Sequence, residues 1–346
     1  MAELAIIADD LTGALDAAAP FAMRGISTCV ALSATGLHQA LASGARVIGV
    51  STDSREISPA AAREAVRQAL AALPPGIRLF KKVDSRLKGN IAAELDALPH
   101  ARSLVVPAIP PFGRWMRNGC LGGFGVSTPI DIAERLGRHA GTAMIPDVET
   151  DTDIEQALNA DIDLPIGARS LAEALAKRMA PPAEVTITLP PTRAYCVIGS
   201  TDPITTGQVT SLLAADPSAF HIPAPNGVAK AAPLDKNLVV LQAVPGATTA
   251  DGKAVATALA QSLVQMEPPD GSLLVLSGGA TAQVILQHLG ISTLDLLGEI
   301  QPGLPLARAG GLTVATKSGG FGDPETLLRL LAPYSTLGNQ DHTHVG

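Results

Sequence analysis

The amino-acid sequence predicts an α/β protein of two domains, each with a largely parallel sheet flanked by helices. Short apolar runs alternate with helical patterns almost from end to end, which is typical of parallel strands buried on both faces. The length of 346 residues suits two domains. Hydrophobic residues make up 47% of the chain and aromatic residues only 3%, so the cores are predicted to be aliphatic.

The order of these patterns predicts the elements one by one. The predicted strands are 3–9, 27–32, 46–52, 78–85, 103–109, 195–201, 237–244, 272–279 and 312–318. The predicted helices are 12–24, 59–73, 90–98, 203–215, 251–266, 281–289 and 324–331.

The alternation weakens between about 145 and 192. An acidic run at 146–165 is followed there by a short helix and by the Pro-rich segment 189–192, which is typical of a linker. We therefore predict domains at 1–190 and 193–346. The acidic run does not fit a calcium loop, because the sixth and twelfth positions counted from Asp147 are Thr152 and Leu158. It is interpreted as a solvated loop.

Composition excludes several classes of protein. A net charge of −7 argues against nucleic acid as a partner. The three cysteines lie far apart, without zinc or disulfide spacing, which favours a reducing cytoplasm. The first residues lack the basic region of a signal peptide, and no apolar run is long enough to span a bilayer. The prediction is a soluble cytoplasmic protein without a membrane partner, and the composition permits a homodimer without pointing to one.

Two adjacent carboxylates, Asp9 and Asp10, end the first predicted strand and precede Thr12. Ligands of parallel sheets bind beyond the carboxyl ends of the strands. Adjacent carboxylates repel each other, which raises one pKa or recruits a cation or a substrate hydroxyl. The alternative is that one aspartate caps the following helix and the other faces water.

A second polar cluster lies at 80–91, "FKKVDSRLKGNI", where a strand ends before a helix. Strand alternation predicts that Lys82 and Asp84 point to the same side. Lys and Arg suit the carboxylate of a small polyhydroxy acid, and Asp and Asn suit its hydroxyls. The alternative is a solvated basic loop, which fits poorly because the cluster begins inside an apolar strand.

A third cluster follows the strand at 103–109. Arg114 and Arg117 are predicted in a loop stiffened by Pro and Gly, beside the single Trp of the chain. Arginine pairs with carboxylate or phosphate in bidentate geometry. The alternative is an ordinary rigid loop.

The second predicted domain repeats one pattern three times: a strand, a glycine-containing turn and a helix. The turns are at 199–203, 277–281 and 317–324, and Asp202 is predicted as an N-cap with Pro203 at the first helical position. Each turn places free backbone amides and the start of a helix dipole at a strand end, and this arrangement favours the binding of an anion. Neither standard phosphate-binding fingerprint is present. Thr316 stands where a Walker A loop needs Gly, and no G-x-G-x-x-G motif follows any predicted strand. The alternative is three tight turns in which Gly avoids a clash.

The two halves together predict a phosphotransferase whose reaction lies in the cleft between the domains. Phosphoryl transfer needs positioning and charge neutralisation. It would use Mg²⁺ on the ATP phosphates and a carboxylate that accepts the hydroxyl proton.

Seven motifs occur in an order that resembles a known family. They are "ADDLTGALD", "KKVDSRLKGN", "PAIPPFGR", "VIGSTDPITTGQ", "SGGATA", "PGLP" and "KSGGFGDPETL". They resemble the four-carbon acid sugar kinase family, which includes threonate, erythronate and 3-oxo-tetronate kinases, and the likeness covers essentially the whole chain. It implies ATP-dependent phosphorylation of a four-carbon sugar acid, typically at its terminal hydroxyl.

The resemblance also implies roles for particular residues. The resemblance does not identify the catalytic base, and Asp10 is predicted for this role because it lies at the end of the first strand, facing the cleft. The substrate residues, taken from the resemblance and from the first polar cluster, are Asp9, Asp10, Thr12, Lys82, Asp84, Ser85, Arg86, Asn90 and Arg114. The ATP residues are Ser200, Ser277, Gly278, Gly279, Ala280, Thr281 and Gly319. No metal ligand is assigned.

The chain departs from the family pattern at three positions. Arg86 replaces a Thr, Lys88 replaces an Arg, and Ala280 replaces an acidic residue of the glycine turn. The chain is also shorter than most members of the family, and the missing residues are predicted to lie before the linker, around 145–190. These departures leave open a second reading, a non-catalytic sensor of a sugar acid or nucleotide. A third reading is a different α/β enzyme, such as an aldolase or a dehydrogenase. The absence of the dinucleotide fingerprint G-x-G-x-x-G and of a plausible Schiff-base context counts against it.

Overall fold

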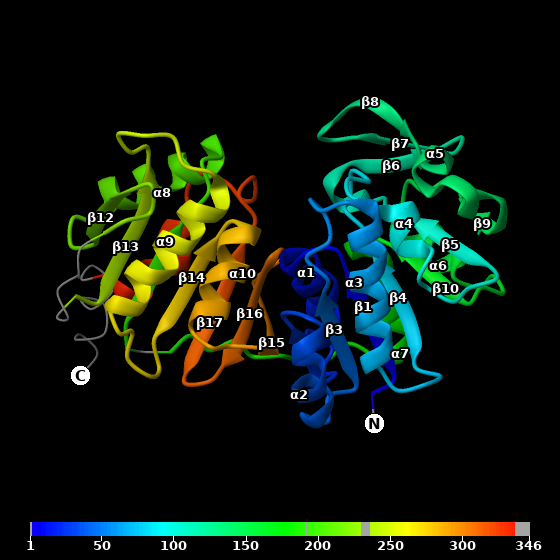
Figure 1. The fold of residues 1–346 in the computed structure, drawn as a ribbon, viewed down its shortest axis with the longest axis horizontal. Coiled ribbons are helices and arrows are strands. Elements are labelled where there is room, and N and C mark those ends of the chain that lie inside the picture. The colour runs from blue at the N-terminus through cyan, green and yellow to red at the C-terminus, as the bar shows by residue number, and fades with distance from the viewer. Residues whose placement is uncertain (1, 191, 230–235, 336–346) are drawn as a thin grey trace, which may run out of the picture. The chain divides into compact units, whose positions relative to one another are not determined.

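The computed structural model describes residues 2–190, 192–229 and 236–335, and the chain divides into two compact units (Figure 1). The first unit is Met1–Val185 together with Ser292–Gly298. The second is Thr186–Ile291 together with Glu299–Gly346. Both units are α/β, which confirms the predicted fold class.

The main sheet of the first unit is parallel except at one edge. Its strands lie in the order β15 (Thr293–Gln301), β2 (Thr28–Ala31), β3 (Val47–Ser51), β1 (Leu4–Ala8), β4 (Arg78–Lys82), β10 (Leu164–Gly167), β5 (Ser103–Val106) and β9 (Ala143–Met144). Residues 293–295 of β15 pair antiparallel with β2. In the centre, Ala8 is paired with Lys82, so β1 and β4 end side by side.

Seven α-helices and a small second sheet complete the described part of the first unit. The helices are α1 (Leu11–Ala22), α2 (Leu37–Ala42), α3 (Pro59–Ala72), α4 (Ile91–Leu95), α5 (Ile132–Leu136), α6 (Asp151–Ala157) and α7 (Arg169–Met179). Helix α1 packs on α7, and α3 packs on α4 (Figure 1). The second sheet is antiparallel: β6 (Arg114–Arg117), β7 (Cys120–Gly123) and β8 (Val126–Asp131).

The second unit has one sheet with helices on both faces. Its strands lie in the order β12 (Phe220–Pro225), β13 (Leu238–Val244), β11 (Ala194–Ile198), β14 (Leu273–Ser277), β17 (Leu312–Lys317) and β16 (Leu304–Ala309). All are parallel except β16. The helices are α8 (Pro203–Ala215), α9 (Gly252–Gln265), α10 (Gly279–His288) and α11 (Thr326–Leu331). Helix α9 packs on α10, and α8 on α11 (Figure 1).

Local sequence explains why these elements form where they do. Strands β1, β11 and β14 are buried along their whole length, as expected for sheets covered on both faces. Asp202 caps α8 by accepting from the Ile204 amide, with Pro203 at the first helical position, as predicted. Among the described residues, no helix is both long and apolar enough to cross a membrane.

Several sequence predictions are wrong in detail. The acidic run is not a loop: it contains α6, closed by a capping box between Thr150 and Asp153. Arg114 and Arg117 lie in strand β6 rather than in a loop, because 114–131 form an antiparallel sheet. Helix α10 begins at Gly279, not 281, and α11 begins at Thr326, two residues later than predicted.

Candidate active site

Arg55 joins the two adjacent carboxylates of the first strand end. Its Nε and Nη2 donate to the two carboxylate oxygens of Asp9, at 2.8 and 2.9 Å. Its Nη1 lies 2.6 Å from Asp10 Oδ2. The Asp9 side chain is 3% exposed, whereas that of Asp10 is 21% exposed. Asp9 is therefore a buried partner of Arg55, and Asp10 is the carboxylate that solvent or a ligand can reach.

The backbone fixes Asp10 at the start of α1. Asp10 is the N-cap of this helix, and its Oδ1 accepts from the Gly13 amide at 2.6 Å. Its Oδ2 accepts from the Thr12 hydroxyl at 3.0 Å. The prediction that one aspartate caps the helix is confirmed, but the idea that the other faces water is wrong, because Asp9 is buried against Arg55.

The environments push the two pKa values apart. Burial alone would raise the pKa of Asp9, but the hydrogen bonds and charge of Arg55, together with Lys81 and Lys82, hold it below its ordinary value. Burial raises the pKa of Asp10, and the negative charge of Asp9 adds to the effect, although Arg55 opposes it. Two carboxylates with opposite shifts can perform different tasks.

Lys82 lies beneath the first turn of α1. Its Nζ donates to the Val83 carbonyl at 3.0 Å and lies 4.0 Å from Asp16 Oδ2. A Cβ on Gly13 would lie 3.4 Å from this Nζ, so the glycine lets the helix start approach the lysine. Lys82 therefore brings a buried positive charge next to Asp10.

Lys81 points to the other face of β4, as strand alternation requires. It is 0% exposed, and its Nζ lies 2.8 Å from Oε2 of Glu94, which is itself buried. The other oxygen of Glu94 accepts from the Ser54 hydroxyl. The buried Lys81–Glu94 pair thus contacts Ser54, the residue that precedes Arg55.

The loop after β4 closes over the Asp9 carboxylate. Asp84 Oδ1 accepts from the Arg86 and Lys88 amides, at 2.9 and 3.3 Å. Gly89 has a φ of +90°, and a Cβ there would lie 3.1 Å from Asp9 Oδ2. Asn90 Nδ2 donates to the Ser54 and Ile57 carbonyls, both at 2.8 Å. The side-chain amide of Asn90 therefore connects this loop to the loop that carries Arg55.

Arg114 contacts the same loop from β6. Its Nη1 donates to Ser85 Oγ at 2.6 Å, and its Nε and Nη2 donate to the Phe124 carbonyl, at 3.2 and 2.9 Å. Its residue exposure is 9%. Burial and the nearby charge of Arg86 lower its pKa, and no ion pair joins it to a carboxylate among the described residues. Arg117 lies on the same strand but pairs with Glu149 at 2.5 Å.

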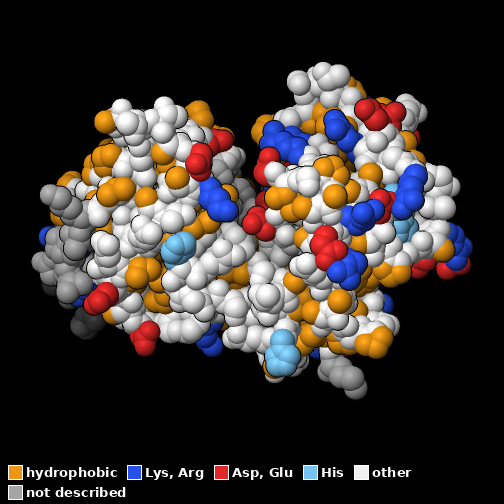
Figure 2. Space-filling view, viewed as in Figure 1, with side chains coloured by type: hydrophobic (Ala, Val, Ile, Leu, Met, Phe, Trp, Pro, Cys, Tyr) orange, Lys and Arg blue, Asp and Glu red, His pale blue; other side chains and the backbone are white. Residues whose placement is uncertain are grey.

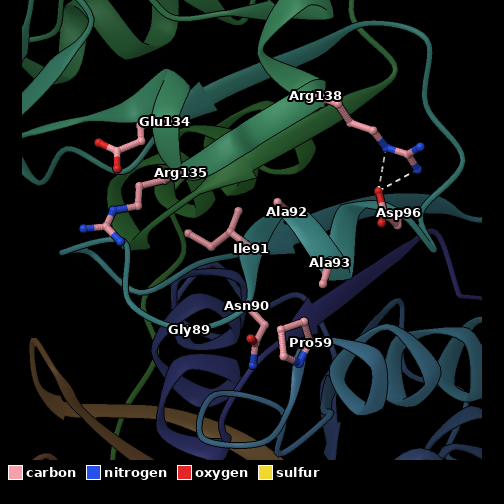
Figure 3. Close-up of a pocket in the computed structure, with 10 residues that line it drawn as sticks. All are labelled: Pro59, Gly89, Asn90, Ile91, Ala92, Ala93, Asp96, Glu134, Arg135 and Arg138. Atoms are coloured by element: carbon pink, nitrogen blue, oxygen red, sulfur yellow. Dashed lines mark hydrogen bonds and ion pairs between the residues drawn. The ribbon is translucent and has the colours of Figure 1, made fainter.

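A pocket of about 560 Å³ lies beside this loop (Figure 3). It is lined by Pro59, Gly89, Asn90, Ile91, Ala92, Ala93, Asp96, Glu134, Arg135 and Arg138. Figure 3 shows Arg138 directed at Asp96, to which it is joined at 2.6 Å. Figure 2 shows Lys and Arg side chains among acidic ones on this face of the first unit. The pocket shares Gly89 and Asn90 with the loop that covers Asp9.

In the second unit, the neighbouring strands β11, β14 and β17 end side by side at the same edge of the sheet. Ile198 is paired with Ser277, and Ser277 with Lys317. The turns that follow touch each other: a Cβ on Gly319 would collide with Ser200 Oγ, and one on Gly199 would collide with the Thr281 side chain. The structure therefore brings together the three glycine turns singled out in the sequence.

These turns leave backbone amides without partners. Gly278, at φ +104°, is the N-cap of α10 and has no side chain to cap the helix, so among the described residues the first amides of this ten-residue helix have no acceptor. Among the described residues, the Gly319 and Gly320 amides also donate to no acceptor. Free amides at a helix start favour an anion.

Polar side chains beneath the third turn hold it in place. Thr205 Oγ1 donates to the Gly319 carbonyl at 2.5 Å. Gln208 Nε2 donates to the Phe321 and Asp323 carbonyls, at 3.0 and 2.7 Å. Both side chains come from α8 and are buried. Within the described parts of the chain, no group of three or more His, Cys, Asp or Glu is arranged to hold a metal ion.

Sequence reasoning missed Arg55 and Glu94. Arg55 lies in "TDSREIS" after β3, and its position at a strand end was the only available signal. The signal for Glu94 was clearer. Lys81 and Lys82 are neighbours on one strand and must face opposite sides, and a lysine that is buried in this way needs a carboxylate partner.

Two family models match the chain in this order. One is described as a sugar-binding N-terminal domain and matches residues 4–183, more than half of the chain. The other is described as a nucleotide-binding C-terminal domain and matches residues 228–327. The carboxylate site lies within the first match, and the turns that end β14 and β17 lie within the second. The two matches place the chain in the class of proteins that join a domain described as sugar-binding to one described as nucleotide-binding.

Relatives narrow this class. The chain is 29% identical over 391 residues to a D-threonate kinase of Bordetella bronchiseptica, covering 94% of this chain and 96% of the relative. It is 29% identical to a D-threonate kinase of Cupriavidus necator, covering 93% and 95%. It is 27% identical to a 3-oxo-tetronate kinase of Methylobacterium radiotolerans, covering 95% and 98%. The chain belongs to the four-carbon acid sugar kinase family.

Solved structures share the fold. A Salmonella typhimurium protein described as a putative tRNA synthase matches with a TM-score of 0.72 at 21% identity, covering 94% of this chain and 98% of that one. A Haemophilus influenzae protein matches with a TM-score of 0.68 at 21% identity, covering 93% and 97%.

Proposed function

We propose that this protein is an ATP-dependent kinase that phosphorylates a four-carbon sugar acid at its terminal hydroxyl. The observation that carries the proposal is Asp10, a ligand-accessible carboxylate held by Arg55 in the part of the chain matched by the sugar-binding model. The relatives named as threonate and 3-oxo-tetronate kinases support this class of substrate. In the proposal, residues 1–190 bind the acid and residues 193–346 bind the nucleotide.

Asp10 is the proposed general base. The acceptor hydroxyl gives its proton to the Asp10 carboxylate as its oxygen attacks the γ-phosphorus of ATP, and the bond to ADP breaks. Burial raises the pKa of Asp10, which makes it a stronger base than an ordinary aspartate. Arg55 and Thr12 orient the carboxylate through its Oδ2. Asp9 keeps Arg55 in place from the buried side.

Arg114 is the proposed partner of the substrate carboxylate. A guanidinium has five N–H donors, and its bonds to Ser85 and Phe124 use three of them. No carboxylate among the described residues forms an ion pair with it, and the nearby charges of Arg86 and Asp84 oppose each other. A carboxylate would satisfy both the donors and the charge. Asp84 Oδ2, Lys82 and the loop held by Asn90 would then meet the hydroxyl groups.

The glycine turns of the second unit are the proposed nucleotide site. The unpaired amides at the start of α10, and those of Gly319 and Gly320, would donate to phosphate oxygens. Ser200 lies against Gly319 and completes this surface. The nucleotide would bind as MgATP, whose metal neutralises charge on the transferring phosphoryl group.

The test measures ADP release from MgATP with a panel of four-carbon sugar acids: D- and L-threonate, D- and L-erythronate, and their 3-oxo forms. We expect turnover of at least one member and a loss of at least about 100-fold in kcat for Asp10→Asn. The hydroxyl group that carries the phosphate in the product is then identified by ³¹P and ¹H NMR.

Two outcomes would contradict parts of the proposal. Absence of turnover on the whole panel, with measurable binding of a sugar acid, would replace the kinase by a non-catalytic sensor. Full turnover by Asp10→Asn would leave the kinase standing and remove Asp10 as its base.

A further inference from the structure

Lys317 is a buried cation that the proposed phosphotransfer chemistry does not use. It is the last residue of β17 and directly precedes the glycine turn, and its side chain is 0% exposed. Buried lysines are normally paired with a carboxylate. Lys81 obeys this rule, since Glu94 lies 2.8 Å away. Lys317 forms no ion pair with any described residue; its three neighbours are neutral oxygens.

These oxygens use all the donors of the ammonium group. Lys317 Nζ donates to Thr205 Oγ1 at 2.8 Å, to the Ser318 carbonyl at 3.0 Å and to the Gly319 carbonyl at 3.3 Å. An ammonium group has three N–H donors. Lys317 therefore has no donor left for a ligand in this arrangement, and it acts on the site through the turn and through its charge.

The lysine also sets the direction of two amides. In a trans peptide the N–H points opposite to the C=O. Because the Ser318 and Gly319 carbonyls point at Lys317, the Gly319 and Gly320 N–H groups point away from it. These two amides have no acceptor among the described residues. The turn thus has a positive charge behind it and two free donors in front, an arrangement that suits a phosphate.

Few ionisable groups face this ammonium. The ionisable groups close enough to affect it are Cys196 on β11 and Asp202 at the start of α8. Burial raises the pKa of Cys196 to about 12, so its thiol stays neutral near neutral pH. Strand β14 and the first two turns of α10 contain no ionisable residue. Burial lowers the pKa of Lys317 to about 8, and the negative charge of Asp202 opposes this only in part.

We propose that Lys317 is a positioning residue that couples nucleotide binding to proton uptake: its protonated form holds the 317–320 turn and attracts the nucleotide phosphates. This inference rests on the proposed nucleotide site. A bound phosphate stabilises the charged lysine, so binding raises the pKa of Lys317 and takes up a proton when the free protein has lost it. Affinity is then constant below about pH 8 and falls at higher pH.

The test is isothermal titration of the full chain with MgADP between pH 7.0 and pH 9.5, in pairs of buffers with different ionisation enthalpies. The difference within each pair gives the protons taken up per nucleotide bound. Phosphate groups titrate near pH 6 and do not contribute here. We expect uptake above pH 8 and a fall in affinity of about 10-fold for each unit by which binding raises the lysine pKa.

Three variants isolate the lysine. Lys317→Met is expected to bind about 10- to 100-fold more weakly at pH 7, with no proton uptake. Lys317→Arg keeps its charge throughout this range, so its affinity is expected not to fall above pH 8. Lys253→Met, an exposed lysine on α9, is expected to behave as the wild type. The wild-type titration needs no substitution, so the test stands even if Lys317→Met fails to fold.

The possible failures are distinguishable. Wild-type protein that binds MgADP equally at all pH values, without proton uptake, would overturn the role of Lys317 and leave the kinase proposal intact. Lys317→Met that weakens binding while the wild type takes up no proton would show a merely structural lysine, which also overturns the inference. Folded wild-type protein that binds no MgADP at any pH would overturn the proposed nucleotide site, and this inference with it.

Discussion

Arg55 holds both carboxylate oxygens of Asp9, through Nε at 2.8 Å and Nη2 at 2.9 Å, in a buried bidentate pair. The third nitrogen of the same guanidinium reaches Asp10 at 2.6 Å. One cation thereby serves two adjacent carboxylates, of which only Asp10 is accessible to a ligand. Asp9 anchors the guanidinium, and the guanidinium orients the proposed base.

Replacing Arg55 by Met is expected to impair both stability and catalysis. Asp9 would be left buried and unpaired, which costs about 3–5 kcal/mol of unfolding free energy. Asp10 would lose a nearby positive charge, so its pKa would rise further. Because the base must be deprotonated, the acidic limb of the kcat/KM profile would move to higher pH by about one unit. The measurement is the pH dependence of kcat/KM.

The control for Arg55→Met is Arg46→Met, which breaks an ion pair with Glu3 that is 42% exposed on each side. Its pH profile is expected to match the wild type, since exposed pairs contribute little. An acidic limb that stays in place in Arg55→Met would show that Arg55 does not control the ionisation of the base.

The buried pair Lys81–Glu94 is expected to stabilise the first unit. Neither side chain is more than 1% exposed, so Lys81→Met leaves Glu94 unpaired at a cost of about 3–5 kcal/mol. Lys81→Met with Glu94→Leu removes both charges and is expected to be more stable than either single variant. Calorimetric unfolding of all three variants checks this. Additive losses in the double variant would mean that the two charges do not depend on each other.

Arg114 and Arg117 provide a matched pair on one strand. Arg114→Ala removes the proposed partner of the substrate carboxylate, and KM for the sugar acid is expected to rise by about 10- to 100-fold, with KM for ATP unchanged. Arg117 is half-exposed and pairs with Glu149, so Arg117→Ala is expected to change neither constant. Steady-state kinetics with each substrate varied in turn decides. Equal effects of the two substitutions would remove Arg114 from the substrate site.

The sequence was sufficient for elements whose identity is encoded locally. Continuous apolar strands and the Asp202–Pro203 cap depend on neighbours in the chain, and both were predicted. The antiparallel strand β16 was missed although its signals are local: Pro302–Gly303 and Gly310–Gly311 are the two-residue connections before and after it. Reading them as hairpin turns would have predicted it.

The site was only partly predictable, because its key contacts join distant parts of the chain. Asp9 and Asp10 follow a strand, and this position alone indicated their importance. Their partner Arg55 lies 46 residues further along in a segment without a recognisable motif. The pairing of β2 with residues 293–295 is longer-range still. Such contacts are set by how the strands are ordered in the sheet, which no single segment encodes.

A side chain at position 319 is expected to displace the Ser200 hydroxyl from its present position. A Cβ at position 319 would collide with Ser200 Oγ, and overpacking of this kind costs about 1–3 kcal/mol. Gly319→Ala should therefore lower both the thermal midpoint and the affinity for MgADP. Adding Ser200→Ala removes the colliding oxygen and should restore most of the midpoint, apart from the hydrogen bond that Ser200 Oγ accepts from the Asp202 amide at 3.2 Å. Gly207→Ala is the control: its Cβ meets no atom within 4 Å, and alanine inside α8 should stabilise by about 0.5–1 kcal/mol without changing affinity. Thermal melts and titration calorimetry of these variants decide, and a midpoint that Ser200→Ala fails to restore would show that the collision is not what excludes a side chain at 319.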